Sequence, residues 1–103
     1  PLSDLESRSV SALVEYLYAF DDHGWAADAP GCWLVYAEDG TEYRVDLEGG
    51  ACTCDDAFYR QPENGCKHVR RVEYLVGDRD IPDWVDQRKI DPWLRRERDA
   101  RSE

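Results

Sequence analysis

Three of the four cysteines and one of the two histidines lie in one short stretch, CTCDDAFYRQPENGCKH. They form two pairs, Cys52 with Cys54 and Cys66 with His68, and a single residue separates the members of each pair. Three thiolates and one imidazole make a complete tetrahedral ligand set for zinc. Because four protein ligands leave no position open for water or substrate, we expect one structural Zn²⁺ ion here.

The spacing of these ligands predicts where the surrounding elements begin and end. Residues two apart in an extended segment point to the same face, so Cys52 and Cys54 can reach one ion from the end of a strand. Residues two apart on a helix lie about 200° apart, so we expect Cys66 in a turn and His68 in the first turn of a following helix. Gly65 permits the unusual backbone angle that such a turn needs.

Other interpretations of the cluster explain less of the sequence. A disulfide across Cys52 and Cys54 would be strained, and disulfides are rare in cytoplasmic proteins. Cysteines that are merely buried leave the placing of His68 unexplained, and a catalytic Cys/His pair needs no second and third cysteine. Cys32 and His23 have no partner at ligand spacing, so we expect a core thiol and a surface or capping residue there.

The elements before the cluster are predicted from periodicity. Ser3 and Glu6 match a capping box at the start of a helix over residues 3–20, where apolar side chains recur at intervals of three and four. Two β-rich runs then flank Asp39-Gly40, which is typical of a tight turn. The alternation in the second run, 43–47, predicts a hairpin with one buried face.

The elements after the cluster are two helices. The segment KHVRRVEYLVG predicts a helix that Gly77 ends, with its valines toward the core. Asp91 followed by Pro92 predicts the start of a second helix. In the long loop between the ligand pairs, Phe58 and Tyr59 are expected to pack beneath the loop.

Together these elements predict an α+β fold. Its centre is a small zinc-stabilised ββα unit (hairpin, zinc loop, helix), with one further helix at each end of the chain. A chain of 103 residues is long enough for one domain of ordinary size, so we expect residues 1–103 to form a single domain. We place an amphipathic N-terminal helix at 1–23, the zinc-finger core at 33–77 and a C-terminal arm or helix at 82–103.

The composition is strongly acidic and contains little lysine. The chain has 14 Asp and 9 Glu against 11 Arg and 2 Lys, with a formal net charge of −10. An aspartate-rich surface keeps a protein hydrated in concentrated salt, where the Debye length falls to about 3 Å at 1 M and self-repulsion is screened. We interpret this as a halophile signature and expect a small stand-alone protein of a salt-loving archaeon. An ordinary acidic mesophilic protein is the alternative.

Positive charge is concentrated in the second half of the chain and favours a nucleic-acid surface there. Residues 1–50 carry a net charge of −9, and the remainder carries −1. Lys67, Arg70 and Arg71 share one face of the predicted helix, opposite its valines, and Arg60 lies in the ligand loop. Phosphate could bind to this group of cations. The alternative is that they pair with nearby carboxylates, and molar salt weakens phosphate binding by a small basic patch.

Protein binding is the second candidate function. Four tryptophans and six tyrosines exceed what one small core needs, and exposed aromatic side chains are favoured anchors of interfaces. Trp84 and Trp93 lie in the sparsely patterned C-terminal third. They could anchor a partner or close the core over the N-terminal helix. The sequence leaves an adaptor role open beside nucleic-acid binding.

Enzymatic and membrane functions find little support in the sequence. It contains no Ser/His/Asp arrangement, no phosphate-cradling glycine loop and no open metal site, so we expect neither an enzyme nor a small-molecule substrate. No run approaches the ~18 apolar residues of a membrane span, and the first residues lack the order of a signal peptide. We therefore expect a soluble, cytoplasmic protein with no membrane partner.

The pattern CTC…CKH, with a hydrophobic strand before it and VRRVEYL after it, resembles the SWIM zinc finger. The signature of that family is Cys-x-Cys, a variable spacer and Cys-x-His, and the match covers roughly residues 33–77. The resemblance implies a ββα fold with Cys52, Cys54, Cys66 and His68 as the zinc ligands. SWIM modules occur in transposases, chromatin-remodelling ATPases, ubiquitin ligases and recombination adaptors. The resemblance therefore implies a module that binds DNA or another protein, such as an accessory factor in DNA-related processes, and it implies no reaction.

Overall fold

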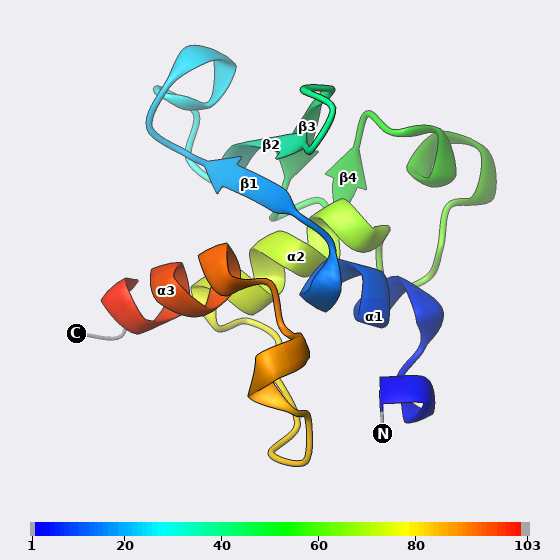
Figure 1. Cartoon of the computed structure of the whole chain (residues 1–103). Coiled ribbons are helices and arrows are strands. Elements are labelled where there is room, and N and C mark those ends of the chain that lie inside the picture. Colours follow the sequence, from blue (N-terminus) through cyan, green and yellow to red (C-terminus); the bar gives the residue numbers. More distant parts are fainter. Residues whose placement is uncertain (1, 102–103) are drawn as a thin grey trace.

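A computed structural model describes residues 2–101 as a four-stranded antiparallel sheet with α-helices at both ends of the chain (Figure 1). The α+β class predicted from the sequence is confirmed. In chain order the helices and strands are α1 (Ser7–Val14), β1 (Leu17–Phe20), β2 (Cys32–Ala37), β3 (Glu42–Asp46), β4 (Ala51–Cys52), α2 (Lys67–Val76) and α3 (Pro92–Arg101). A short helical turn, η1 (Leu2–Asp4), precedes α1, and three more lie between the later elements: η2 (Gly24–Ala26), η3 (Asp56–Arg60) and η4 (Gln87–Lys89).

The sheet has the order β1-β2-β3-β4, and every neighbouring pair is antiparallel. The predicted hairpin is β2 and β3. Gly40 has φ +88°, and the N–H of Thr41 donates to Asp39 Oδ1 at 3.0 Å, which closes the turn as the sequence indicated. Val45 is fully buried, whereas Arg44 beside it is exposed, so the expected alternation along β3 is confirmed.

The prediction of one helix over residues 3–20 is wrong in its second half. Helix α1 ends at Val14, Glu15 is extended, and residues 17–20 form strand β1, which pairs with β2. The capping box is also wrong, because Glu6 occupies the N-cap position and makes no side-chain capping hydrogen bond. Its carboxylate accepts hydrogen bonds from Arg70 instead.

Helix α2 is the central helix of the fold. It contacts β1, β3 and β4 across one face of the sheet, and α1 and α3 pack against its flanks (Figure 1). As predicted, Gly77 ends it, in a left-handed conformation with φ +87°. Because α2 is covered from several sides, it buries seven residues: His68, Val69, Arg70, Arg71, Val72, Tyr74 and Leu75.

The chain after α2 returns to the core through Asp91 and α3. The start of α3 at Pro92 agrees with the Asp-Pro signal, and the N–H of Trp93 donates to Asp91 Oδ1 at 3.3 Å. Trp93 packs edge-on against Tyr18 and Phe20 of β1, with ring centroids 5.8 Å and 6.0 Å away. Residues 1 and 102–103, at the limits of the predicted domain, lie outside the described residues. Within residues 2–101, every helix is too short or too polar to cross a lipid bilayer.

Candidate metal centre

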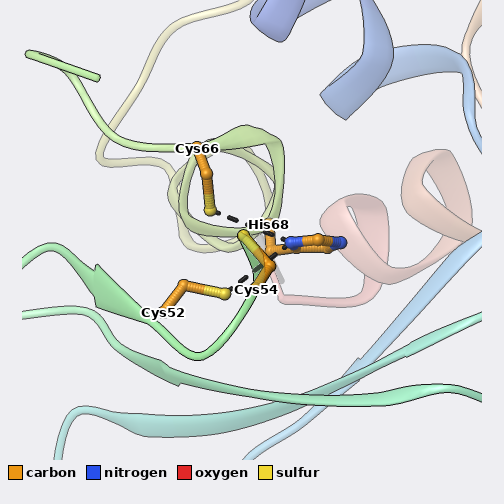
Figure 2. A group of neighbouring side chains, drawn as sticks. All are labelled: Cys52, Cys54, Cys66 and His68. Atoms are coloured by element: carbon orange, nitrogen blue, oxygen red, sulfur yellow. Dashed lines mark hydrogen bonds between the residues drawn. The ribbon is translucent and has the colours of Figure 1, made fainter. Parts of the chain in front are cut away.

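The two ligand pairs meet between the sheet and the start of α2 (Figure 2). Cys52 is the last residue of β4, and Cys54 follows it. Cys66 is the N-cap of α2, with extended backbone angles, and His68 lies in the first turn. This is the arrangement that the ligand spacing predicted, with one pair at a strand end and the other straddling a helix start.

The separations between the ligand atoms fit one tetrahedral ion. The three sulfur atoms and the histidine nitrogen all lie within 4.8 Å of one another. His68 Nδ1 is 3.7 Å from Cys52 Sγ and 3.8 Å from Cys66 Sγ. A tetrahedral Zn²⁺ with bonds of about 2.3 Å to sulfur and 2.0–2.1 Å to nitrogen places those atoms roughly 3.6 Å apart. The residues present therefore fit a Cys₃His metal site, with His68 binding through Nδ1.

The backbone around the second pair depends on a glycine. Gly65 has φ +88°, and a Cβ built there would lie 3.0 Å from Val69 Cγ1 in the first turn of α2. A side chain at this position would push the turn away from the helix that carries His68. Gly65 also offers its carbonyl oxygen to Arg70 Nε at 2.8 Å, which ties the turn to the body of α2.

The imidazole ring of His68 is held by stacking as well as by burial. Tyr43 of β3 lies parallel to it, with ring centroids 4.1 Å apart and planes inclined by 22°. In Figure 2 the second ring nitrogen, Nε2, points away from the sulfur atoms. Tyr43 thus limits the plane of the ring, and Nδ1 is the nitrogen that lies near Cys52 and Cys66.

The pKa values of the three thiols in the cluster are shifted in different directions. A hydrogen bond from Cys52 lowers the pKa of the Cys66 thiol to about 4, and His68 acts in the same direction. The same hydrogen bond, together with burial, raises the pKa of Cys52. Burial raises the pKa of Cys54. Negative charge therefore gathers on Cys66 first, and a divalent cation among the three sulfurs would displace the remaining protons.

The loop between the ligand pairs is braced from outside the cluster. Asp56 receives a two-pronged hydrogen bond from Arg8 of α1, at 2.8 Å and 2.9 Å, and the N–H of Ala57 points at Cys54 Sγ at 3.4 Å. Arg8 lowers the pKa of the Asp56 carboxyl. Sequence reasoning missed this pair because its members lie 48 residues apart and no local pattern connects them.

The prediction that Phe58 and Tyr59 pack beneath this loop is wrong. Both lie in the π-helical turn η3 and are among the most exposed aromatic side chains of residues 2–101. Phe58 lines an open hollow of about 420 Å³, together with Gly49, Gly50 and Pro62, and not a closed apolar core. The side chain of Ala57 lies against the core instead.

Two of the four residues predicted to contact nucleic acid are buried. Arg70 is 1 % exposed and Arg71 is fully buried, so the expectation that they face outward, opposite the valines, is wrong. Arg70 donates to Ser9, Gly65 and Glu6, and Arg71 binds Asp91 together with backbone carbonyls of α1 and β1. The physical reason is that α1 and α3 cover the face of α2 that the sequence pattern left open. These two guanidinium groups are not part of an accessible surface.

The other two predicted cations remain at the surface. Lys67 binds Glu15 at 2.7 Å and stays partly exposed. Arg60 is 72 % exposed and touches Asp56 only at 3.5 Å. They line an open hollow of about 670 Å³ beside the metal centre, together with His68 and the hydroxyl-bearing residues Ser7, Thr41, Tyr43 and Thr53.

Four further residues were considered in the sequence analysis: Cys32, His23, Trp84 and Trp93. Cys32 and His23 lie outside the group of ligand atoms, in agreement with the sequence analysis. Trp93 is partly buried against the core, whereas Trp84 is 50 % exposed, so only Trp93 closes the core.

No family model matches the chain, and no curated protein and no solved structure shows significant similarity to it. The likeness to the SWIM signature therefore depends on the four ligands, their spacing and the elements that carry them.

Proposed function

We propose that this protein is a non-enzymatic zinc-binding module of SWIM type, in which one structural Zn²⁺ organises a surface for nucleic acid in DNA-related processes. One observation carries the metal assignment: three sulfur atoms and one imidazole nitrogen lie within 4.8 Å of one another, at separations that suit a tetrahedral ion. A closed set of four protein ligands leaves no position for a substrate, which is why the proposal includes no reaction.

Zinc is favoured over other metals by the chemistry of the ligands. Thiolates select soft or borderline ions, and a tetrahedral S₃N set is typical of structural zinc. When bound, the ion supplies a fixed cross-link between β4 and α2. Binding energy at such sites is folding energy, on the order of 10 kcal/mol near neutral pH. Cys54, Cys66 and His68 are buried, so the ion would be shielded from solvent on several sides.

A second candidate function is a protein-binding adaptor with a purely structural zinc. The half-exposed Trp84 favours it, because an exposed tryptophan is a common interface anchor. Trp84 lies in the loop before η4, outside the metal loop. An adaptor surface there would work independently of the surface beside the metal.

The chain offers matched controls for testing the metal assignment. Cys66→Ser removes a ligand, while Cys32→Ser changes the one cysteine outside the cluster. His68→Asn and His23→Asn form the second pair. We expect mass spectrometry to find about one equivalent of zinc in wild type, Cys32→Ser and His23→Asn. Cys66→Ser and His68→Asn should lose zinc and have lower thermal stability. A folded wild type holding less than about half an equivalent would overturn the assignment.

A further inference from the structure

Two aromatic rings project from the metal loop into solvent. Phe58 is 70 % exposed and Tyr59 is 75 % exposed, and they are the two most exposed large hydrophobic side chains in residues 2–101. Their ring centroids lie 4.8 Å apart, in an edge-to-face arrangement. Exposing two adjacent rings forgoes the burial that stabilises a small fold, so a role at the surface is the natural explanation.

These rings are carried on a turn that is held at several points. Cys54 and Cys66 lie on either side of the loop, and Arg8 fixes Asp56 at the start of η3. Gln61 ends the turn with φ +45°, a left-handed conformation that is uncommon for a residue other than glycine. A held turn presents its side chains with little further entropy to lose on binding.

The first and last residues of the turn, Asp56 and Arg60, line the hollow beside the metal centre. Arg60 follows Tyr59 in η3 and forms part of the wall of the hollow, and Lys67 lies across from the loop at the start of α2. Hydroxyl groups of Ser7, Thr41, Thr53 and Tyr43 complete the lining. Asp56 also lies there, but Arg8 and Arg60 both contact its carboxylate, while Asp55 adds one further negative charge. Phe58 lines a second hollow, of about 420 Å³, so the rings and the phosphate donors are linked through η3, where Arg60 directly follows Tyr59.

We propose that Phe58, Tyr59 and the hollow that Arg60 lines bind single-stranded nucleic acid. Bases would stack on the two rings, while Arg60, Lys67 and the hydroxyl groups would contact the phosphates that follow. The inference rests on the proposed function, because the metal ligands hold both ends of the loop. A duplex fits less well, because its bases are already stacked on one another, and its dense charge would be repelled by a chain of net charge −10.

The charge distribution gives this binding a particular salt dependence. Arg60 and Lys67 are two cations that can each contact one phosphate. For single strands each such contact contributes about −0.7 to the slope of log K against log salt, so the slope expected is about −1.4. Affinity would then fall only about 25-fold when salt rises tenfold. Stacking, which salt affects little, would supply the rest.

The test measures fluorescence anisotropy of a labelled oligo(dT) of about fifteen nucleotides, a length that one small module can cover, and of a duplex of equal length. Each of Phe58→Ala and Tyr59→Ala is expected to weaken binding roughly 5- to 150-fold, the range reported by alanine substitution of stacking aromatics. Trp84→Ala is the matched control, an exposed aromatic residue outside the metal loop, and should leave binding unchanged.

The charged residues are tested by the slope, which a merely structural role would not change. Arg60→Ala should reduce the magnitude of the slope by about 0.7. Arg88→Ala should not, because Arg88 is also an exposed arginine but pairs with Asp86 outside the metal loop. Asp55→Asn should tighten binding by removing a carboxylate from the rim of the hollow.

Zinc content and circular dichroism are recorded for each variant, so that failure of this inference is distinguishable from failure of the metal assignment. Zinc-loaded, folded protein that binds no oligo(dT), or that prefers the duplex, overturns the inference and leaves the zinc module intact. Unaltered affinity in Phe58→Ala and Tyr59→Ala overturns it as well. Light scattering supplies one more outcome: a dimer that Phe58→Ala and Tyr59→Ala dissociate would assign the rings to self-association instead.

Discussion

Replacing Arg71 by methionine is expected to be the most damaging single change outside the metal ligands. Its guanidinium group is fully buried and joins three elements. Nη1 donates to the carbonyl oxygens of Ala12 and Glu15, both at 2.9 Å, and Nη2 donates to Leu17 O at 2.8 Å and to Asp91. One side chain thus satisfies the end of α1, the start of β1 and the carboxylate before α3.

The magnitude follows from what the substitution leaves behind. Asp91 is only 3 % exposed and would lose its cation, and breaking one side of a buried ion pair typically costs about 3–5 kcal/mol. A domain of this size is stable by about 5–15 kcal/mol, so the loss is a large fraction of the total. At a denaturant slope of about 2 kcal/mol per molar urea, the unfolding midpoint should fall by about 2 M.

The assay is urea unfolding followed by tryptophan fluorescence, in saturating zinc and with zinc content checked. Arg88→Met is the matched control, because Arg88 is 88 % exposed in its pair with Asp86, and it should change stability by less than about 0.5 kcal/mol. Adding Asp91→Asn to Arg71→Met removes the unpaired charge, keeps an acceptor for the N–H of Trp93, and should recover much of the loss. If Arg71→Met proved as stable as Arg88→Met, the reasoning would be refuted. A double variant no better than Arg71→Met would show that the unpaired carboxylate is not the cause.

Two further substitutions test the metal loop. Gly65→Ala should destabilise the protein by about 1 kcal/mol more than Gly77→Ala. Both glycines have positive φ, but only a Cβ at Gly65 would press on Val69. Equal urea midpoints for the two variants would contradict this. Arg8 holds the pKa of Asp56 below its usual value, so the stabilisation by this carboxylate is present above about pH 4 and lost as pH falls below that. The difference in unfolding free energy between wild type and Asp56→Asn should therefore be constant from pH 8 to pH 5 and shrink toward pH 3. A difference that already declines above pH 6 would assign the effect to another group.

The parts of the fold that the sequence predicted are those that short-range geometry determines. The spacing of Cys66 and His68, together with the helical pattern of the residues that follow, indicates a helix start between them. Asp39-Gly40 closes a tight turn whatever packs around it, and Gly77 can take the left-handed angle that ends α2. In each case a few neighbouring residues carry the whole signal, so the hairpin, the end of α2 and the meeting of Cys52, Cys54, Cys66 and His68 in one group were predicted correctly.

Strand β1 was missed because two periodicities coincide in it. Leu13 and Leu17 are four apart, as on one face of a helix, whereas Leu17 and Ala19 are two apart, as on one face of a strand. Pairing with β2, from Leu17 opposite Ala37 to Phe20 opposite Leu34, decides between them. That pairing joins residues up to twenty positions apart, and no local pattern reports it.

The buried arginines were missed for a related reason. Arginine is almost never fully buried unless it is paired, so a sequence pattern places it at the surface by default. Apart from Gly65, which accepts from Arg70, the partners of Arg70 and Arg71 are distant in sequence: Glu6, Ser9, Asp91 and the carbonyl groups of Ala12, Glu15 and Leu17. Because α1 and α3 cover α2, these two arginines are buried where the sequence pattern predicts exposure, and this covering is visible only in the assembled fold.

The distribution of burial indicates what a metal ion would contribute to this fold. Between Asp55 and Gly65 no residue is buried, whereas α1, the sheet and α2 share one continuous apolar core. Of these eleven residues, Ala57 is the one whose apolar side chain packs against that core. Their order depends on the ligands at either end, on the contact between Arg8 and Asp56, and on the hydrogen bond from Arg70 to Gly65. The segment that depends most on the metal is thus the one that carries Phe58, Tyr59 and Arg60. Loss of zinc would therefore disorder the proposed binding surface before it disordered the core.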